Sequence, residues 1–137
     1  MRFMIIVKAT GDSEAGVMPG EELLATMHRY HEELAKAGVL LDASGLQPSA
    51  KGWRIKYSAD KRTFIDGPFV ETKELIAGYS IIRAASKQEA IEWTKRFPNP
   101  AVDGEEGEIE VRQLFELEDF PASETIDRFR KIGVGTK

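Results

Sequence analysis

Hydrophobic positions in the first third of the chain change from a strand pattern to a helix pattern. Residues 3–7 are a continuous apolar run with β-branched side chains, which predicts a buried strand. Residues 10–16 are polar and glycine-rich, which predicts a loop. Between residues 21 and 37 apolar side chains recur at spacings of three and four, which predicts an amphipathic helix that ends at Gly38. The residues of this stripe are Leu23, Met27, Tyr30 and Leu34.

The middle of the chain predicts strands and a hairpin. A second strand is expected from residue 39 to about residue 45. Trp53, Ile55 and Tyr57 alternate with polar residues, and residues 63–65 return the chain, which together predict a hairpin.

The last part of the chain predicts another strand, helix, strand and tail. Residues 78–84 read as a strand, and Ser86 with Glu89 forms a capping box that predicts the start of a second helix. A final strand is expected to place four apolar residues on one side, namely Ile109, Val111, Phe115 and Leu117. Ser123 introduces a short helix. We therefore expect a domain over residues 1–120 and a C-terminal tail with a short helix over residues 121–137.

This order of elements, β-α-β-hairpin-α-β, predicts an α+β fold of the ferredoxin-like split βαβ type. Two helices cover one face of such a sheet. The apolar content of the strands exceeds what two helices can hide, so we expect two subunits to pack face to face as a homodimer. The strand residues on which this expectation rests are Val7, Ile55, Ile81 and Val111.

Composition narrows the class of partner. The chain of 137 residues carries a net charge of −4 and no block of Lys or Arg, which argues against nucleic acid or an anionic membrane as its partner. It has no cysteine, its apolar N-terminal run reaches Lys8 too soon for a signal peptide, and no apolar run approaches the roughly 20 residues of a membrane span. We expect a cytoplasmic protein whose partners are a second copy and a small-molecule ligand.

The two histidines of the chain, His28 and His31, are three positions apart on the first long predicted helix. Without a fixed third ligand this pair is a weak metal signal, and no dinucleotide or phosphate-loop motif is present, so we expect neither metal nor cofactor. His31 lies close to Met27 on the buried stripe, whereas His28 lies at its flank. His31 is either a general base aimed at a pocket or a hydrogen-bonded histidine at the edge of the core.

Asp66 begins the most distinctive stretch, Asp66-Gly67-Pro68-Phe69, near the middle of the chain. These residue types favour turns for local backbone reasons, so a plain turn is one interpretation. The other is that Asp66 supplies the carboxylate partner of His31, a pair suited to acid–base catalysis. Four further residues are candidates for substrate binding: Lys73 and Arg54 by their charge, Tyr30 and Phe69 as aromatic walls, although aromatic residues more often belong to the core.

The run from Asp66 to Glu74, followed by Gly78-Tyr79, resembles the signature of the DGPF group within the YCII-related proteins. The segments Tyr30–Leu34, Ala37–Leu40 and Gly45-Leu46 resemble the same group, and the likeness extends from residue 1 to about residue 117.

The resemblance implies a ferredoxin-like subunit that forms a dimeric α+β barrel, with a His–Asp active site carried onto His31 and Asp66. A related member of the family is a dehydrochlorinase of a hydroxylated aromatic compound, and some DGPF proteins are associated with sigma factors. Two hypotheses follow. The first is a small enzyme of lyase or isomerase type, acting on a small organic, aromatic substrate, with His31 as base and Asp66 as orienting group or acid. The second is a non-catalytic ligand-binding or sigma-factor-associated regulatory dimer, in which Asp66 caps a turn and His31 packs.

Overall fold

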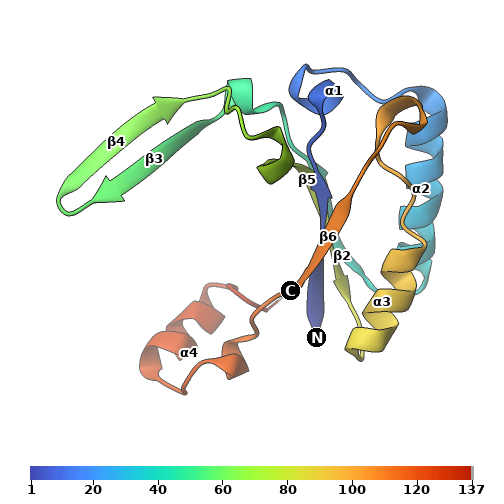
Figure 1. Cartoon of the computed structure of the whole chain (residues 1–137). Coiled ribbons are helices and arrows are strands. Elements are labelled where there is room, and N and C mark those ends of the chain that lie inside the picture. Colours follow the sequence, from blue (N-terminus) through green and yellow to red (C-terminus); the bar gives the residue numbers. More distant parts are fainter. Residues whose placement is uncertain (137) are drawn as a thin grey trace.

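The computed structural model describes residues 1–136 and places two helices against one face of a four-stranded antiparallel sheet (Figure 1). The elements of this body are β1 (Arg2–Lys8), α2 (Glu21–Lys36), β2 (Leu40–Gly45), β5 (Ile76–Arg83), α3 (Lys87–Lys95) and β6 (Ile109–Gln113). The strand order is β2-β5-β1-β6. Together with the element order, this confirms the α+β fold of the ferredoxin-like type.

The core lies between the sheet and the two helices. Alternate residues of the central strand β1, Phe3 and Ile5, point toward α2 and α3, because side chains along a strand alternate between its two faces. The buried cluster consists of Phe3, Ile5, Tyr30, Leu34, Ile82, Ala84 and Ala90.

Both predicted helix boundaries have a local cause. Gly38 has a φ of +74° just beyond the end of α2, a conformation that favours glycine. At the start of α3 the Ser86 hydroxyl accepts a hydrogen bond from the Glu89 amide at 3.1 Å, while the Glu89 carboxylate accepts one from the Ala85 amide at 2.9 Å. The Ser86 half of the expected capping box is therefore present, whereas the Glu89 carboxylate accepts from the amide of Ala85, one residue before the N-cap, and not from that of Ser86.

The opposite side of the sheet, here called the open face, carries Met4, Ile6, Tyr79 and Ile81. No element among residues 1–136 packs over it as α2 and α3 pack over the other face (Figure 1). The strand register corrects one expectation: Val7 and Val111 lie on the helix-covered side with Ile5, so their apolar surface needs no second subunit. Ile81 is on the open face as expected.

Two segments extend outward on the side of the open face (Figure 1). The first is the hairpin of β3 (Trp53–Ser58) and β4 (Lys61–Asp66), which forms a separate two-stranded sheet. The second is the C-terminal tail with α4 (Glu124–Lys131). The guanidinium of Arg2, a residue only 7% exposed, holds this tail by donating to the Glu116 carboxylate at 3.0 Å and to the Phe115 carbonyl at 2.9 Å.

The structure differs from the sequence expectation in two short segments. A one-turn helix, α1 (Gly11–Glu14), stands where a loop was expected, and Thr10 and Ser13 cap it reciprocally. The last strand, β6, ends at Gln113 instead of continuing to Leu117, because its neighbour β1 begins at Arg2 and offers no further partner. The part of the chain that the structure describes also contains four short 3-10 helices: η1 (Ser49–Lys51), η2 (Thr72–Glu74), η3 (Val102–Gly104) and η4 (Leu117–Asp119). No helix within residues 1–136 has both the length and the apolar character needed to cross a membrane.

The burial of Leu34 gives a stability prediction. Its side chain is fully buried between α2 and the sheet, so Leu34→Ala should lower the free energy of unfolding by about 2–5 kcal/mol in urea denaturation. Leu24 lies on the same helix but is 50% exposed, so Leu24→Ala should cost roughly 1 kcal/mol or less. Equal losses for the two variants would contradict the packing of α2 described above.

Candidate functional site

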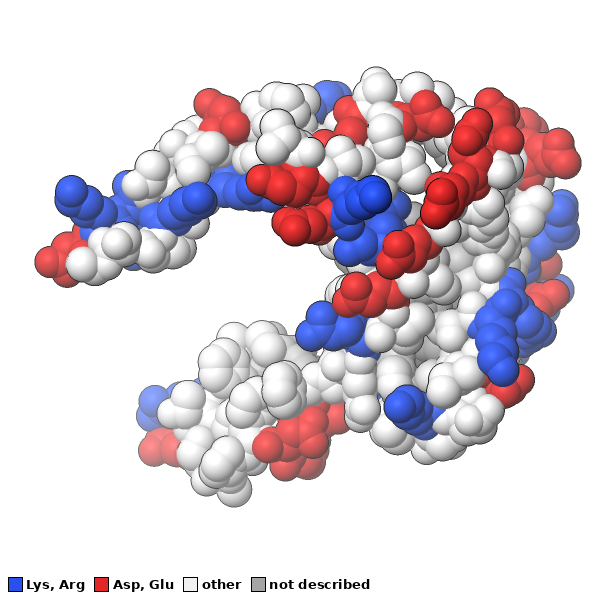
Figure 2. Space-filling model, in the orientation of Figure 1, with Lys and Arg blue, Asp and Glu red and all other residues white. Residues whose placement is uncertain are grey.

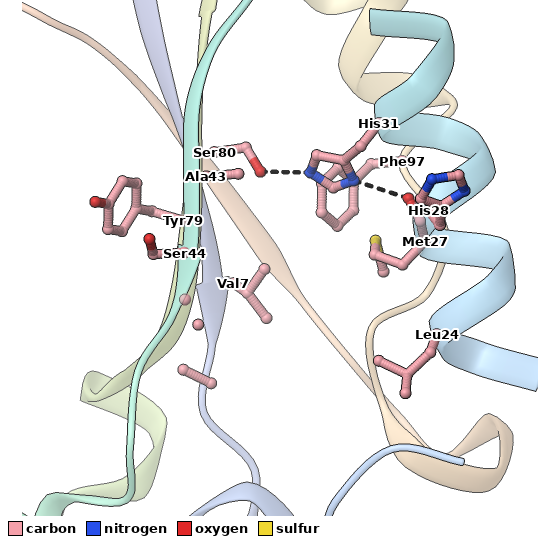
Figure 3. A pocket seen from close by; sticks show the side chains of 13 residues that line it. Val7, Leu24, Met27, His28, His31, Ala43, Ser44, Tyr79, Ser80 and Phe97 are labelled. Atoms are coloured by element: carbon pink, nitrogen blue, oxygen red, sulfur yellow. Dashed lines mark hydrogen bonds between the residues drawn. The ribbon is translucent and has the colours of Figure 1, made fainter. Parts of the chain in front are cut away.

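A cavity of about 410 Å³ lies between α2 and the end of the sheet formed by β2 and β5 (Figure 3). Most of its wall is apolar, and small residues on the two strands leave the space open. The residues that line it are Val7, Leu24, Met27, His28, His31, Ala43, Ser44, Gly45, Ala77, Gly78, Tyr79, Ser80 and Phe97. A cavity of this size suits a small organic molecule.

His31 reaches from α2 across to the sheet, and both of its ring nitrogens have partners (Figure 3). Nδ1 is 2.8 Å from the Met27 carbonyl oxygen, and Nε2 is 2.7 Å from the Ser80 hydroxyl. Because a carbonyl oxygen can only accept, Nδ1 must carry the proton that is donated to it. In the neutral imidazole Nε2 therefore holds the lone pair and accepts the Ser80 hydroxyl proton.

Ser80 comes from β5 and is only 3% exposed. It alternates with Tyr79 and Ile81, so its side chain lies on the helix-covered side of the sheet with Gly78 and Ile82. Sequence reasoning missed this residue. The available signal was a hydroxyl at an inward-facing position of an otherwise apolar strand, where a buried polar group needs a hydrogen-bond partner.

Chemically, the arrangement places one proton-accepting nitrogen at the wall of a largely apolar cavity. The ring is held edge-on to Phe97 and Tyr30, with centroid distances of 6.0 Å and 5.6 Å, so its orientation is fixed by packing as well as by hydrogen bonds. An imidazole with a fixed tautomer and orientation beside a space for a ligand provides one part of what general acid–base catalysis requires.

Asp66 ends β4 at the base of the hairpin, with an exposed side chain. The residues that line the His31 cavity, all within the described part of the chain, do not include it. Within one chain, therefore, the structure does not bring Asp66 and His31 together in one cavity, and their pairing stays a prediction.

The turn that follows Asp66 is part of a tightly packed joint at the hairpin base. The Gly67 amide donates to the Gly52 carbonyl at 2.9 Å, and a Cβ on Gly67 would lie 1.8 Å from the Ser49 carbonyl oxygen, so only glycine fits. Ser49 accepts a hydrogen bond from the Phe69 amide at 3.0 Å, and its own amide and hydroxyl donate to the Glu14 carboxylate. This joint ties the hairpin to α1.

Of the four expected substrate-binding residues, three lie at this hairpin base or next to it. The Arg54 guanidinium stacks 3.8 Å above the Phe69 ring and lies 3.6 Å from the Glu71 carboxylate. Lys73 is exposed in η2. None of them is among the residues that line the His31 cavity. In residues 1–136, no group of three or more His, Cys, Asp or Glu side chains is placed to hold a metal ion.

Tyr30, the fourth candidate, is 5% exposed in the core, and its hydroxyl donates to the Trp93 carbonyl at 2.7 Å. Burial raises the pKa of Tyr30 from 10.0 to about 12; the nearby Arg96 lowers it and Glu33 raises it, each to a smaller extent.

The raised pKa of Tyr30 predicts a loss of stability at high pH. Above pH 10 the unfolded chain releases the Tyr30 proton, whereas the folded chain keeps it up to about pH 12. The contribution of protonated Tyr30 to the free energy of unfolding is therefore complete below pH 10 and is lost as the pH rises from 10 to about 12. Tyr30→Phe should remove this part of the pH dependence, whereas Tyr57→Phe, at a 67% exposed site, should keep it. Urea denaturation at about pH 9 and about pH 12 measures this difference in the free energy of unfolding. An unchanged pH dependence in Tyr30→Phe would be the contrary result.

Comparisons with known proteins place the chain in a family. The model of the YCII-related domain matches residues 1–118. An uncharacterised protein of Rhizobium meliloti (strain 1021) is 30% identical over 94 residues, which cover 69% of this chain and 74% of that protein. The solved structure of 5-chloro-2-hydroxyhydroquinone dehydrochlorinase from Burkholderia phenoliruptrix, in complex with 2,5-dihydroxybenzoquinone, is 14% identical, with a TM-score of 0.46 and coverage of 85% of this chain and 95% of that one. On the family match and the sequence relative, the chain belongs to the YCII-related domain family.

Proposed function

We propose that this protein is a small enzyme that uses His31 as a general base on a small organic substrate bound between α2 and the sheet. The observation that carries the proposal is the position of the His31 imidazole. Its Nδ1–H is donated to the Met27 carbonyl, and its Nε2 faces Ser80 at the wall of the cavity. The reaction class this favours is proton abstraction or transfer, as in a lyase or isomerase.

The wall of the cavity favours a compact, mostly apolar substrate, such as an aromatic ring with a hydroxyl group. Val7, Leu24, Met27 and Phe97 supply apolar contacts, and the aliphatic and aromatic groups outnumber the polar ones. A substrate hydroxyl or an acidic C–H group that displaces the Ser80 hydroxyl from Nε2 would meet the lone pair directly.

Asp66 has a conditional role in this proposal. Both nitrogens of His31 are already bonded within the chain, and Asp66 is outside the cavity wall, so a His31–Asp66 pair requires a second copy to bring its carboxylate to the site. In the absence of such a pair, Asp66 belongs with Gly67 and Phe69 to the joint that holds the hairpin.

We also place the chain in the DGPF group of its family, on the run from Asp66 to Glu74, and propose that it forms a homodimer through the open face. Figure 2 displays a deep recess between the hairpin and the tail, in front of that face. The hairpin adds exposed apolar surface, with Trp53 60% and Phe64 59% exposed. In a dimer with a two-fold axis the same patch of each subunit faces its counterpart, so the exposed apolar surface of both subunits is buried in one interface.

The catalytic proposal predicts base-dependent exchange of substrate protons. We expect the wild type in D₂O to accelerate deuterium incorporation into activated phenols and 2-oxo acids, followed by NMR, and His31→Gln to lose about 10²-fold or more of that rate. His28→Gln, a change at the other histidine of the cavity, should retain it, because His28 has an exposed side chain on the rim.

Two results would decide against catalysis. Folded His31→Gln with an unchanged exchange rate would remove His31 from the mechanism. Binding of the compounds to the wild type without any exchange would favour the alternative, a non-catalytic ligand-binding or sigma-factor-associated dimer.

The dimer proposal predicts the effect of a charge on the open face. Wild-type protein should show twice the mass of one chain in light scattering, and Ile81→Lys should give a folded monomer, because burying an unpaired ammonium in the interface is costly. Gln88→Lys, on the exposed surface of α3, should leave the dimer intact. A monomeric wild type would overturn the proposal, as would a dimeric Ile81→Lys.

A further inference from the structure

A second cavity, also of about 410 Å³, adjoins the His31 cavity at the end of the sheet. Its wall is formed by the segment from Thr10 to Pro19, which includes α1, by residues 45–48 after β2, and by residues 100–102. The two cavities share Val7, Gly45 and Ala77 as lining residues. The two cavities are therefore neighbours at the place where β1, β2 and β5 lie side by side.

We propose that the two cavities form one continuous site for an elongated ligand, with a hydroxylated head at His31 and an apolar tail in the second cavity. This inference rests on the proposed function of the His31 cavity and adds the substrate class: a phenol-like head that carries an alkyl or similar apolar chain.

The second cavity has the chemistry that an apolar tail requires. Its polar side chains near α1 are already paired: the Thr10 amide donates to the Ser13 hydroxyl at 2.8 Å, and the Ser13 amide donates to the Thr10 hydroxyl at 3.1 Å. The Lys8 ammonium lies 4.0 Å from the Glu110 carboxylate. With these groups engaged, the remaining wall is dominated by aliphatic residues, and burial of an alkyl chain there is favoured by about 0.8 kcal/mol for each buried methylene in general.

The mouth of the second cavity is unusually apolar for a surface. Met18 is 78% exposed, Leu46 is 46% exposed and Val17 is 45% exposed, and all three line the cavity. A cluster of exposed apolar side chains around a cavity indicates a binding site, whereas single exposed apolar residues need no explanation. A ligand tail seated in the cavity would cover these side chains.

The junction between the two cavities can be closed without disturbing the sheet. A Cβ added to Gly45 meets no atom within 4 Å, so a larger side chain there would occupy open space. Gly78, its partner across β2 and β5, is different: a Cβ there would lie 3.0 Å from the Ser44 carbonyl oxygen, and the backbone would have to shift. Gly45→Val is therefore the suitable change, because a β-branched residue also suits a strand.

The test compares 4-methylphenol with 4-hexylphenol in NMR titrations of the wild type, Gly45→Val and the control Gly20→Val. Gly20 precedes α2 outside both cavities, and a Cβ there also meets no atom within 4 Å. In the wild type both phenols should shift the His31 imidazole signals, and only 4-hexylphenol should also shift the Met18 methyl signal. 4-Hexylphenol should bind at least about tenfold more tightly than 4-methylphenol, because its additional methylene groups are buried.

In Gly45→Val the ratio of the two affinities should fall to about one and the Met18 shift should disappear, whatever the affinity for 4-methylphenol itself becomes, because Gly45 lines both cavities. Gly20→Val should change neither the ratio nor the shift. If both phenols shift His31 but 4-hexylphenol has no advantage and leaves Met18 unaffected, the continuous site is wrong and the proposal for His31 stands. If the advantage survives in Gly45→Val, the continuous site is also wrong. If 4-hexylphenol shifts Met18 and neither phenol shifts His31, both proposals are wrong.

Discussion

The hydrogen-bonded series from the Met27 carbonyl through His31 to the Ser80 hydroxyl joins helix α2 to the middle of the sheet. A hydroxyl on the buried side of β5 needs a partner, because an unpaired buried polar group costs about 1–3 kcal/mol. His31 provides that partner from across the core at 2.7 Å. The bond adds to the apolar packing of Tyr30 and Leu34 that holds α2 against the sheet, and the small residues of β2 and β5 leave the cavity open. The same histidine thus contributes to the packing of α2 and to the wall of the candidate site.

The conspicuous turn at Asp66 has a different part in the molecule. Its glycine is required by the close approach of the Ser49 carbonyl, and its Phe69 is held by the Ser49 hydroxyl and the Arg54 guanidinium. These contacts fix the direction in which the hairpin leaves the body. The most distinctive residues of the sequence therefore place a projecting segment, and the acid–base chemistry we propose is at His31, on the other side of the sheet.

Local sequence patterns predicted what depends on local forces. The apolar stripe of α2, its end at Gly38 and the Ser86 cap of α3 all follow from interactions within one turn or one helix, and the structure contains each of them. The length of β6 was wrong because a strand ends where its neighbour ends, and the start of β1 is far away in sequence. The hydrogen bond between Ser80 and His31 joins residues 49 positions apart and has no local sequence signature, so it could be identified only from the three-dimensional structure.

The tautomer of His31 is the most direct test of the central claim, because the proposed base requires a lone pair on Nε2. Long-range ¹H–¹⁵N correlation spectra of the imidazole ring distinguish a protonated from an unprotonated nitrogen. We expect the neutral ring to carry its proton on Nδ1, and we expect the Nε2 signal to change selectively when a phenol binds. In Ser80→Ala the proton should remain on Nδ1. A ring protonated on Nε2, or one whose signals ignore every ligand that binds the protein, would contradict the assignment of His31 as the base.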